Sequence, residues 1–397
     1  MSITPFTHQQ LLPQEEKLEI SKQKSELFIG IPKETRFQER RICLTPDAVN
    51  SLVSHGHRVI LEAGAGLHSS YSDKEYSDAG AEITHDTKKV FSCPMILKVE
   101  PPSIEEIEMM KPDSLLISAV QLKTRRKEHF EALQKKKITA LAFEFIKDSD
   151  GSYPAVKSLS EIAGTASVLI AAELMINDTL GKGLLFGNIT GVPPTDVVII
   201  GAGTVGEFAA KTATGLGANV KVFDNSITKL RRLQNNLNVP IFTSTIQPKA
   251  LLKALRRTDV AIGAMRGKDR CPVVVTETMV EHMKKGAVIV DVSIDTGGCF
   301  ETSEITSHEK PTFVKYDVIH YCVPNIPSRY SKTASLSISN ILTPYLLQIA
   351  EDGGIEAAIR CDQGLKHGVY LYHGIFTNKT VADWFSFAYS DINLIVF

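Results

Sequence analysis

Three glycines and an aspartate have the types and spacing that suit the binding of a phosphate-bearing ligand. Gly201, Gly203 and Gly206 form a G-x-G-x-x-G pattern, and Asp224 follows at the usual distance of about 20 residues. Without Cβ atoms, such glycines allow a tight turn and let backbone N–H groups approach a pyrophosphate, while the carboxylate accepts hydrogen bonds from ribose hydroxyls. The pattern therefore predicts a dinucleotide site. The predicted cofactor-binding residues of this stretch are Gly201, Gly203, Thr204, Val205, Gly206 and Asp224.

The residues around the glycines have the pattern of a strand, a turn and a helix. The apolar run 197–200 is typical of a strand buried on both faces. A helix is expected from about Gly203 to Leu216, with its positive N-terminal end directed at the bound anion. The next strand, over 219–223, ends at Asp224. This context is what makes the glycine pattern informative, because the same spacing alone is common in loops.

Asp224 favours NAD over NADP as the cofactor, because its carboxylate would repel a 2′-phosphate. The two residues after it carry no cation. Lys229, Arg231 and Arg232 lie a turn further on and are interpreted as a solvated helix face. NADP therefore stays open as an alternative.

The bulk composition limits the class of protein. A chain of 397 residues with 43% hydrophobic residues predicts two globular domains, and a net charge of -1 gives no general attraction to nucleic acid or anionic membranes. We find neither an apolar run of the roughly 18 residues that a membrane span needs nor a signal-peptide pattern, so a cytoplasmic protein is expected. The cysteines include no C-x-x-C pair and predict no metal site. They are Cys43, Cys93, Cys271, Cys299, Cys322 and Cys361.

Strands alternate with helices on both sides of the glycine pattern, which predicts an α/β protein with doubly wound parallel sheets. A polar extension, residues 1–26, precedes the first strand. A long connecting helix is expected over 158–180, with Ser160 as its cap, and a second long helix over 334–350. The aromatic stretch 368–397 is interpreted as a docked tail or an oligomer contact.

Several stretches together resemble the family of alanine dehydrogenases and pyridine nucleotide transhydrogenase α-subunits. Besides the glycine loop, they are 29–34, 39–46, 62–66, 158–164, 291–301 and 320–327. The resemblance implies two Rossmann-like domains with a cleft between them. It implies a discontinuous substrate domain, 27–154 plus 332–397, and an NAD-binding domain, 155–331. Alanine dehydrogenases interconvert L-alanine with pyruvate and ammonia, so the resemblance also implies a small amino- or keto-acid substrate and a homo-oligomer, hexamer or dimer.

The resemblance assigns roles to four further residues. It places the substrate arginine at Arg41, whose guanidinium can grip a carboxylate through two parallel hydrogen bonds. It places the catalytic aspartate at Asp295, which can orient water or ammonia or take a proton. Ser160 and Asn325 match positions near the cofactor. The alternative for Arg41 is a surface arginine, and the alternative for Asp295 is a turn cap. Ser160 and Asn325 could each equally be a helix cap or form a loop hydrogen bond.

Two positions depart from the family pattern. Glu100 stands where family dehydrogenases have a lysine in Lys-Val-Lys-Glu-Pro, and Gln121 where they have a histidine in Leu-His-Leu. Gln121 can donate a hydrogen bond but cannot titrate, and Glu100 reverses the charge. Lys98 would share a strand face with Glu100. It is therefore expected either to reach the pocket or to form a surface pair with Glu100.

Three functions follow from these residues. The first is an alanine-type dehydrogenase working through Arg41, Asp295, Gln121 and Lys98. The second is an oxidoreductase for another amino or imino acid, such as a diamino acid or an opine, in which Glu100 pairs with a cationic amine. The third is an NAD(H)-binding subunit or sensor, as in transhydrogenase, which the missing membrane segment weakens. The first is preferred.

Overall fold

Short apolar runs separated by helices form the first of two sheets. The computed structural model describes residues 24–36, 38–177, 180–267 and 270–396. The strand order is β15-β14-β6-β5-β4-β1-β2-β3. The strands β1 to β6 are parallel to one another, β14 is antiparallel to β6, and β15 is antiparallel to β14. The strands are β1 (Phe28–Ile31), β2 (Arg58–Glu62), β3 (Glu82–Thr84), β4 (Met95–Leu97), β5 (Leu115–Ser118), β6 (Thr139–Ala142), β14 (Val369–Tyr372) and β15 (Ile375–Phe376).

The second sheet contains the glycine pattern. Its order is β12-β13-β11-β10-β7-β8-β9, and only β12 is antiparallel to its neighbour among these strands. The strands are β7 (Asp196–Ile200), β8 (Asn219–Phe223), β9 (Phe242–Ser244), β10 (Val260–Gly263), β11 (Val288–Asp291), β12 (Thr312–Lys315) and β13 (Val318–Tyr321). Two parallel-dominated sheets confirm the predicted fold class.

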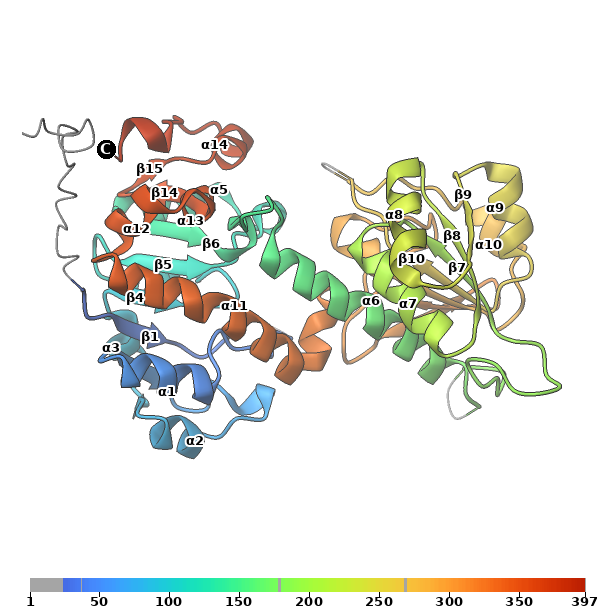
Figure 1. Cartoon of the computed structure of the whole chain (residues 1–397), viewed down its shortest axis with the longest axis horizontal. Coiled ribbons are helices and arrows are strands. Elements are labelled where there is room, and N and C mark those ends of the chain that lie inside the picture. Colours follow the sequence, from blue (N-terminus) through green and yellow to red (C-terminus); the bar gives the residue numbers. More distant parts are fainter. Residues whose placement is uncertain (1–23, 37, 178–179, 268–269, 397) are drawn as a thin grey trace, which may run out of the picture.

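Each sheet forms its own lobe; one long helix runs from the first lobe into the second, and another runs from the junction back along the first lobe (Figure 1). The long helices are α6 (Pro154–Leu174) and α11 (Ser331–Glu351). The shorter helices are α1 (Pro46–Ser54), α2 (Asp73–Asp78), α3 (Thr87–Phe91), α4 (Ile104–Met109), α5 (Lys127–Lys135), α7 (Thr204–Gly215), α8 (Ile227–Leu237), α9 (Pro248–Leu255), α10 (Glu277–Glu281), α12 (Ile355–Cys361), α13 (Gln363–Gly368) and α14 (Lys379–Phe385).

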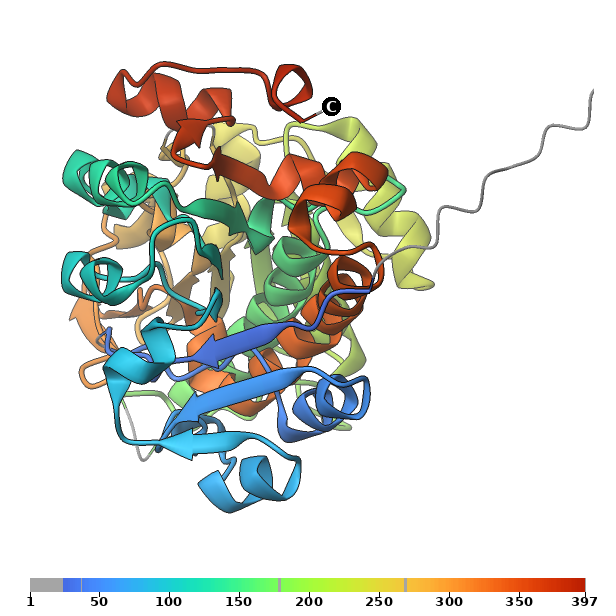
Figure 2. The ribbon, with the colours of Figure 1, turned by 90° about the vertical axis from the view of Figure 1, so that its left-hand side faces the viewer.

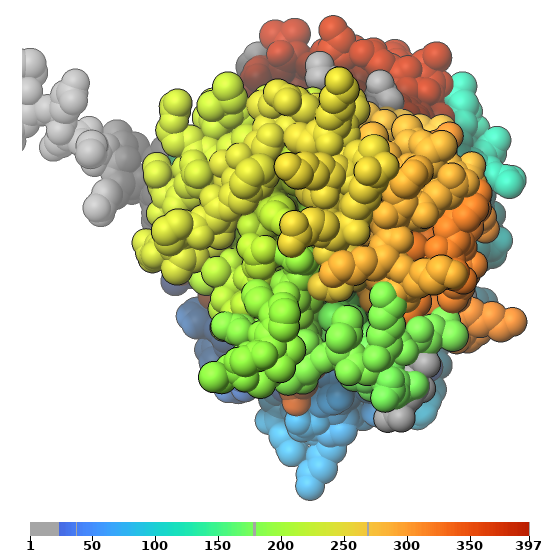
Figure 3. Space-filling model, turned by 90° about the vertical axis from the view of Figure 1, so that its right-hand side faces the viewer, coloured from blue at the N-terminus to red at the C-terminus, as the bar shows by residue number. Residues whose placement is uncertain are grey.

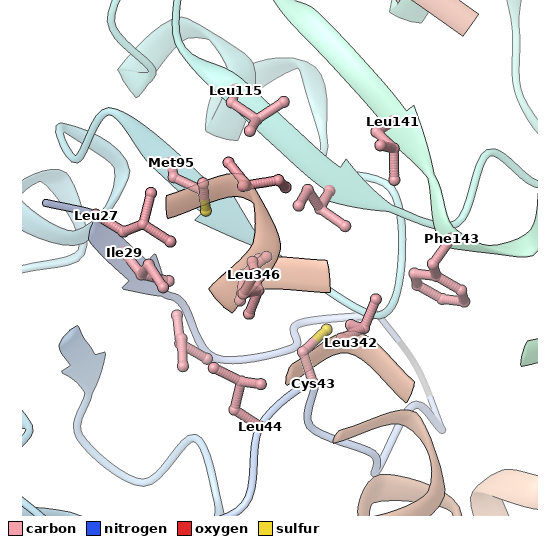
Figure 4. Close-up of a cluster of buried hydrophobic side chains, with 14 of the residues drawn as sticks. Leu27, Ile29, Cys43, Leu44, Met95, Leu115, Leu141, Phe143, Leu342 and Leu346 are labelled. Atoms are coloured by element: carbon pink, nitrogen blue, oxygen red, sulfur yellow. The ribbon is translucent and has the colours of Figure 1, made fainter. Parts of the chain in front are cut away.

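The α11 helix anchors the first lobe by covering one face of its sheet. Leu342 and Leu346 are buried in the same cluster as Ile29 of β1, Met95 of β4 and Leu115 of β5 (Figure 4). Burying one side chain of this size stabilises the folded state by about 1.5–3 kcal/mol. The second long helix was thus correctly expected. It also holds the loop after β1, because Ile42 N donates to Ser335 Oγ at 2.9 Å.

The α6 helix begins earlier than expected and ends earlier too. It starts at Pro154, whose fixed φ suits the first helical position, and ends at Leu174, so the expected bounds 158–180 were wrong. Ser160 lies inside the helix and does not cap it. Among the described residues, α6 is long and apolar enough to cross a membrane by length and composition, but it packs against α7 and α11. A core helix passes the same test.

The C-terminal stretch belongs to the first sheet and is more than a tail. Its strands β14 and β15 extend the sheet beyond β6, and in Figure 2 this red segment lies at the edge opposite the blue strands. The first 23 residues of the predicted extension lie outside the described residues. Ser25 N donates to Ala350 O at 2.9 Å, so the end of the extension contacts α11.

Candidate active site

The three glycines of the nucleotide loop differ in what requires them. Gly201 has a φ of +113°, and a Cβ there would overlap the carbonyl oxygen of Ala264. A Cβ on Gly206 would overlap the carbonyl oxygen of Gly201. A Cβ on Gly203, in contrast, would meet nothing within 4 Å. The fold itself thus requires two of the glycines, and the third faces open space at the start of α7.

Asp224 lies directly after β8 and holds the glycine loop. Its Oδ2 accepts a hydrogen bond from Ala202 N, and its Oδ1 accepts one from Ser226 N, both at 2.7 Å. Carboxylate oxygens accept more than one hydrogen bond, so both can also receive ribose hydroxyls. The Arg232 side chain is 50% exposed, in keeping with the solvated face expected for it, and its Nη2 also donates to Ala202 O at 3.4 Å and pairs with Glu207. Its guanidinium therefore contacts the backbone of the glycine loop.

Close packing between α6 and α7 places Ser160. A Cβ on Gly164 would overlap the carbonyl oxygen of Val205, which lies with Thr204 in the first turn of α7. Ser160 lies one turn before Gly164 and shares its helix face. The packing of α6 against α7 therefore brings this helix face close to the glycine loop.

Arg41 lies in the loop after β1 and is paired with Glu39, which sequence reasoning missed. Arg41 Nε donates to Glu39 Oε1 at 2.7 Å, and Nη2 donates to Oε2 at 2.6 Å. Both side chains are buried. Burial raises the pKa of Glu39, but the charge and hydrogen bonds of Arg41 outweigh this and lower the pKa to about 2. Both groups are therefore charged near neutral pH.

Asp295 and Asn325 approach this pair from the second lobe. Asp295 lies in the turn Val292–Thr296 after β11, and its Oδ1 accepts a hydrogen bond from Asn325 N at 3.1 Å. Asn325 Nδ2 donates to Glu39 Oε2 at 2.9 Å. Burial raises the pKa of Asp295, and a lesser influence of Arg41 lowers it. The carboxyl is thus better suited to accept a proton than an ordinary aspartate.

A second missed residue, Asp291, fixes the loop that carries Asp295. It ends β11, is fully buried, and accepts hydrogen bonds from Cys299 N at 2.9 Å and Ser303 Oγ at 2.7 Å. It also accepts one from Ser293 N at 3.0 Å. An acidic residue at the end of a strand and before a Gly-Gly pair was the available signal.

Sheet order brings the two halves of the nucleotide lobe together. The strands β11, β10 and β7 are neighbours, so Asp295 and the glycine loop lie at the same carboxyl edge. Strands are spaced by about 4.8 Å, which separates the two strand ends by about 10 Å. Met265 N donates to Ser293 Oγ at 2.9 Å and links the intervening loop to the Asp295 turn.

Glu100 lies at the centre of a group of arginines. Arg36 Nη1 donates to Glu100 Oε2 at 2.5 Å and also to Gln121 Oε1. Gln121 Nε2 donates to Glu100 Oε1 at 2.6 Å. Arg41 and Arg125 approach the same carboxylate at 3.8 and 3.6 Å. The carboxylate is therefore surrounded by donors within the first lobe.

Lys98 occupies neither of the two positions expected for it. It is buried, and its Nζ lies 3.1 Å from Glu106 and 3.4 Å from Glu34. It therefore neither pairs with Glu100 at the surface nor stands free in the cleft. The loops thus bring Arg41, Glu100, Gln121, Asp295 and Asn325 into one connected set, with Lys98 in a buried group beside it.

Comparisons with known proteins match this architecture over most of the chain. The N-terminal domain model of the alanine dehydrogenase/PNT family matches residues 30–163, and its C-terminal domain model matches residues 167–379. An alanine dehydrogenase from Staphylococcus epidermidis is 37% identical over 366 residues, which are 92% of this chain and 98% of that protein. One from Mycolicibacterium smegmatis is 37% identical over 367 residues, with the same coverage of both chains.

Solved structures agree. An L-alanine dehydrogenase superposes with a TM-score of 0.85 at 34% identity, covering 91% of this chain and 99% of the other. A transhydrogenase from Sinorhizobium meliloti superposes with a TM-score of 0.76 at 25% identity, covering 89% and 99%. The chain therefore belongs to the alanine dehydrogenase/PNT family and is an NAD-dependent oxidoreductase.

Proposed function

We propose that this protein interconverts an amino acid with its 2-keto acid and ammonia, and that L-alanine and pyruvate are its substrates. The observation that carries the proposal is the contact chain across the lobes, in which Asn325 joins Asp295 to Glu39 and Glu39 holds Arg41. A carboxylate-binding cation and a carboxyl with a raised pKa are the groups that a keto-acid site needs. The relatives named above are alanine dehydrogenases.

Each residue of this chain has a proposed task. Arg41 binds the substrate carboxylate through guanidinium donors beyond the two that Glu39 receives, since a guanidinium carries five. Asp295 takes or returns the proton when ammonia or water is exchanged at the substrate carbon. Bound NAD supplies or accepts the hydride. The glycine loop, Asp224 and Ser160 hold that cofactor at the carboxyl edge of the second sheet.

The contacts of Glu100 bear on the choice of substrate. Its two oxygens receive Arg36 and Gln121, and Arg41 and Arg125 lie within 3.8 Å. A carboxylate that is already compensated by guanidinium groups gains little from a cationic amine on a substrate. A diamino acid is therefore disfavoured relative to alanine. A purely NAD(H)-binding role, as in transhydrogenase, is the remaining alternative.

Two further expectations are also proposals. We infer a substrate domain of residues 27–154 plus 332–397 and a nucleotide domain of 155–331, since α6 leads the chain into the second lobe and α11 leads it back into the first. We infer a cytoplasmic homo-oligomer, a hexamer or dimer. Apolar side chains are exposed in the segment between α6 and β7, which is bright green in the lower half of Figure 3. They include Leu184, Leu185, Ile189 and Val192. Light scattering after gel filtration tests the oligomer.

The activity is tested by following NADH oxidation with ammonia and a panel of 2-keto acids that includes pyruvate. NADH binding is first established from the fluorescence of the bound cofactor. Turnover that is fastest with pyruvate is the expected result. Binding of NADH without turnover on any keto acid would overturn the proposal and leave the NADH-binding role.

A further inference from the structure

Three loops that leave neighbouring strands meet in a closed triangle of hydrogen bonds. Arg36 follows β1, Glu100 follows β4 and Gln121 follows β5, and these strands are adjacent in the order β5-β4-β1. Arg36 donates to both other side chains, and Gln121 donates to Glu100. The three hydrogen bonds have consistent polarity, and both that Arg36 donates come from Nη1, so the direction of the guanidinium is fixed.

Within the triangle, Glu100 anchors the other two side chains and is buried, whereas the Arg36 cation is accessible. The Glu100 side chain is 3% exposed and the Arg36 side chain is 42% exposed. The other two arginines near Glu100 are less accessible, at 7% for Arg41 and 19% for Arg125. Arg41 also commits two of its nitrogens to Glu39. Arg36 is therefore the guanidinium of this group that a small molecule reaches most readily.

The backbone of Gln121 has an unusual conformation at this point. Its φ is 44°, in the left-handed region that side-chain-bearing residues seldom adopt, and its N–H donates to Glu144 Oε1 at 3.3 Å. Strained residues of this kind cluster where a side chain has to be aimed. Here the conformation directs the amide of Gln121 at both Arg36 and Glu100.

We propose that Arg36 is a catalytic residue whose guanidinium, positioned by Glu100 and Gln121, donates to the keto oxygen of the substrate. The proposal rests on the keto-acid chemistry proposed above. When ammonia forms a bond to the keto carbon, the π-electron pair of the carbonyl moves onto the oxygen. An N–H group aimed at that oxygen stabilises the developing negative charge. In this step Arg36 donates a hydrogen bond only, and Asp295 handles the proton that ammonia loses.

The proposal is tested with Arg36→Met, which keeps the stem of the side chain and removes the charge. We expect kcat for pyruvate amination to fall by about 10²–10³-fold, the usual effect of removing one such donor, with the NADH dissociation constant unchanged. Arg36→Lys restores a cation and should recover part of kcat. Glu100→Gln weakens the anchor and should lower kcat more than it raises KM.

Two arginine variants separate this role from general support of the fold. Arg125→Met removes another guanidinium from the same carboxylate, and Arg126→Met removes an exposed charge next to it in sequence. If the arginines only neutralise Glu100, Arg36→Met and Arg125→Met will lower kcat alike, and the proposal is wrong. If Arg36 touches the keto oxygen, its loss will exceed that of Arg125 by at least tenfold, and Arg126→Met will behave as the parent.

A binding measurement distinguishes failure of this proposal from failure of the keto-acid function. Pyruvate is titrated into the NADH-loaded parent and Arg36→Met proteins without ammonia, and the fluorescence of the bound NADH is followed. If the parent binds pyruvate but never turns it over, the dehydrogenase proposal fails, and a weakening by about tenfold or more in Arg36→Met would still support the contact. No pyruvate binding by the parent, or equal affinities together with equal kcat values in the two proteins, would overturn the Arg36 proposal.

Discussion

Glu39 receives two parallel hydrogen bonds from Arg41, and it does so out of contact with bulk water. The same carboxylate accepts Asn325 Nδ2 from the second lobe at 2.9 Å. Glu39 thus fixes the direction of the guanidinium and also joins the loop after β1 to the nucleotide lobe. The proposed substrate arginine is therefore held in place before any ligand arrives.

Replacing Glu39 should destabilise the protein strongly. Glu39→Gln leaves the buried Arg41 cation with only the more distant Glu100, at 3.8 Å, as a counter-ion. Breaking a buried pair costs about 3–5 kcal/mol. We expect a loss of that size in the free energy of unfolding, measured by urea denaturation. Glu131→Gln is the matched control, because Glu131 pairs with Lys127 at 3.9 Å and both side chains are about half exposed. That change should cost under about 1 kcal/mol, and equal losses in the two variants would contradict the buried pair.

Glu34 should make stability fall between mildly acidic and neutral pH. Burial raises the pKa of Glu34 from 4.5 to about 7, although Lys98 lowers it. The folded state then keeps a proton that the unfolded chain loses above pH 4.5, so stability decreases as pH rises from 4.5 through 7. Glu34→Gln removes this effect. Between pH 5 and 8 the variant should gain about 2–3 kcal/mol in free energy of unfolding relative to the parent. Urea titrations at pH 5, 6, 7 and 8 measure it, and a constant difference would exclude the raised pKa.

The strands that carry the site were predictable because each is a short apolar run next to a helix. The run 197–200 became β7, and the glycine turn after it lies at the start of α7 as expected. The chain pattern also placed Asp224 at the end of β8. Strands and helices of this kind depend on the residues within them, so a single sequence is enough to predict them.

The charged network was not predictable in the same way. Whether Glu100 meets Arg36 or Lys98 depends on which strands are neighbours, and βα alternation alone does not fix that order. Their spacing of two residues predicts Lys98 and Glu100 as a possible pair. In the structure each finds other partners, Glu34 and Glu106 for Lys98, and Arg36 and Gln121 for Glu100. The helix start at Pro154 was missed because Ser160 offered a competing cap signal.

Asp224 should contribute to cofactor affinity directly. Asp224→Ala removes the acceptor for Ala202 N and the proposed acceptor for the ribose hydroxyls. A hydrogen bond to a charged group is worth about 1.5–3 kcal/mol, so the NADH dissociation constant should rise by about 10–150-fold. Fluorescence titration with NADH measures this. Arg41→Ala should leave that constant unchanged, and an Asp224→Ala protein that binds NADH like the parent would place the cofactor elsewhere.

Gly203→Ala should impair cofactor binding without impairing folding. Gly203 has a φ of -76°, which alanine adopts readily, and an added Cβ meets no atom within 4 Å. The methyl group would fill space that the pyrophosphate needs, because the second glycine of the pattern permits its close approach. NADH affinity should therefore fall by at least about tenfold, while the free energy of unfolding stays within about 0.5 kcal/mol of the parent.

Gly206→Ala is the matched counterpart, and it should act on the fold itself. Its Cβ would overlap the carbonyl oxygen of Gly201, a backbone atom that cannot rotate away. Overpacking of this kind costs about 1–3 kcal/mol or more, which urea denaturation measures. The two alanine variants should thus separate, one losing NADH affinity at parental stability and the other losing stability. A Gly203→Ala protein that binds NADH like the parent would show that the open space above this loop is not where the pyrophosphate lies.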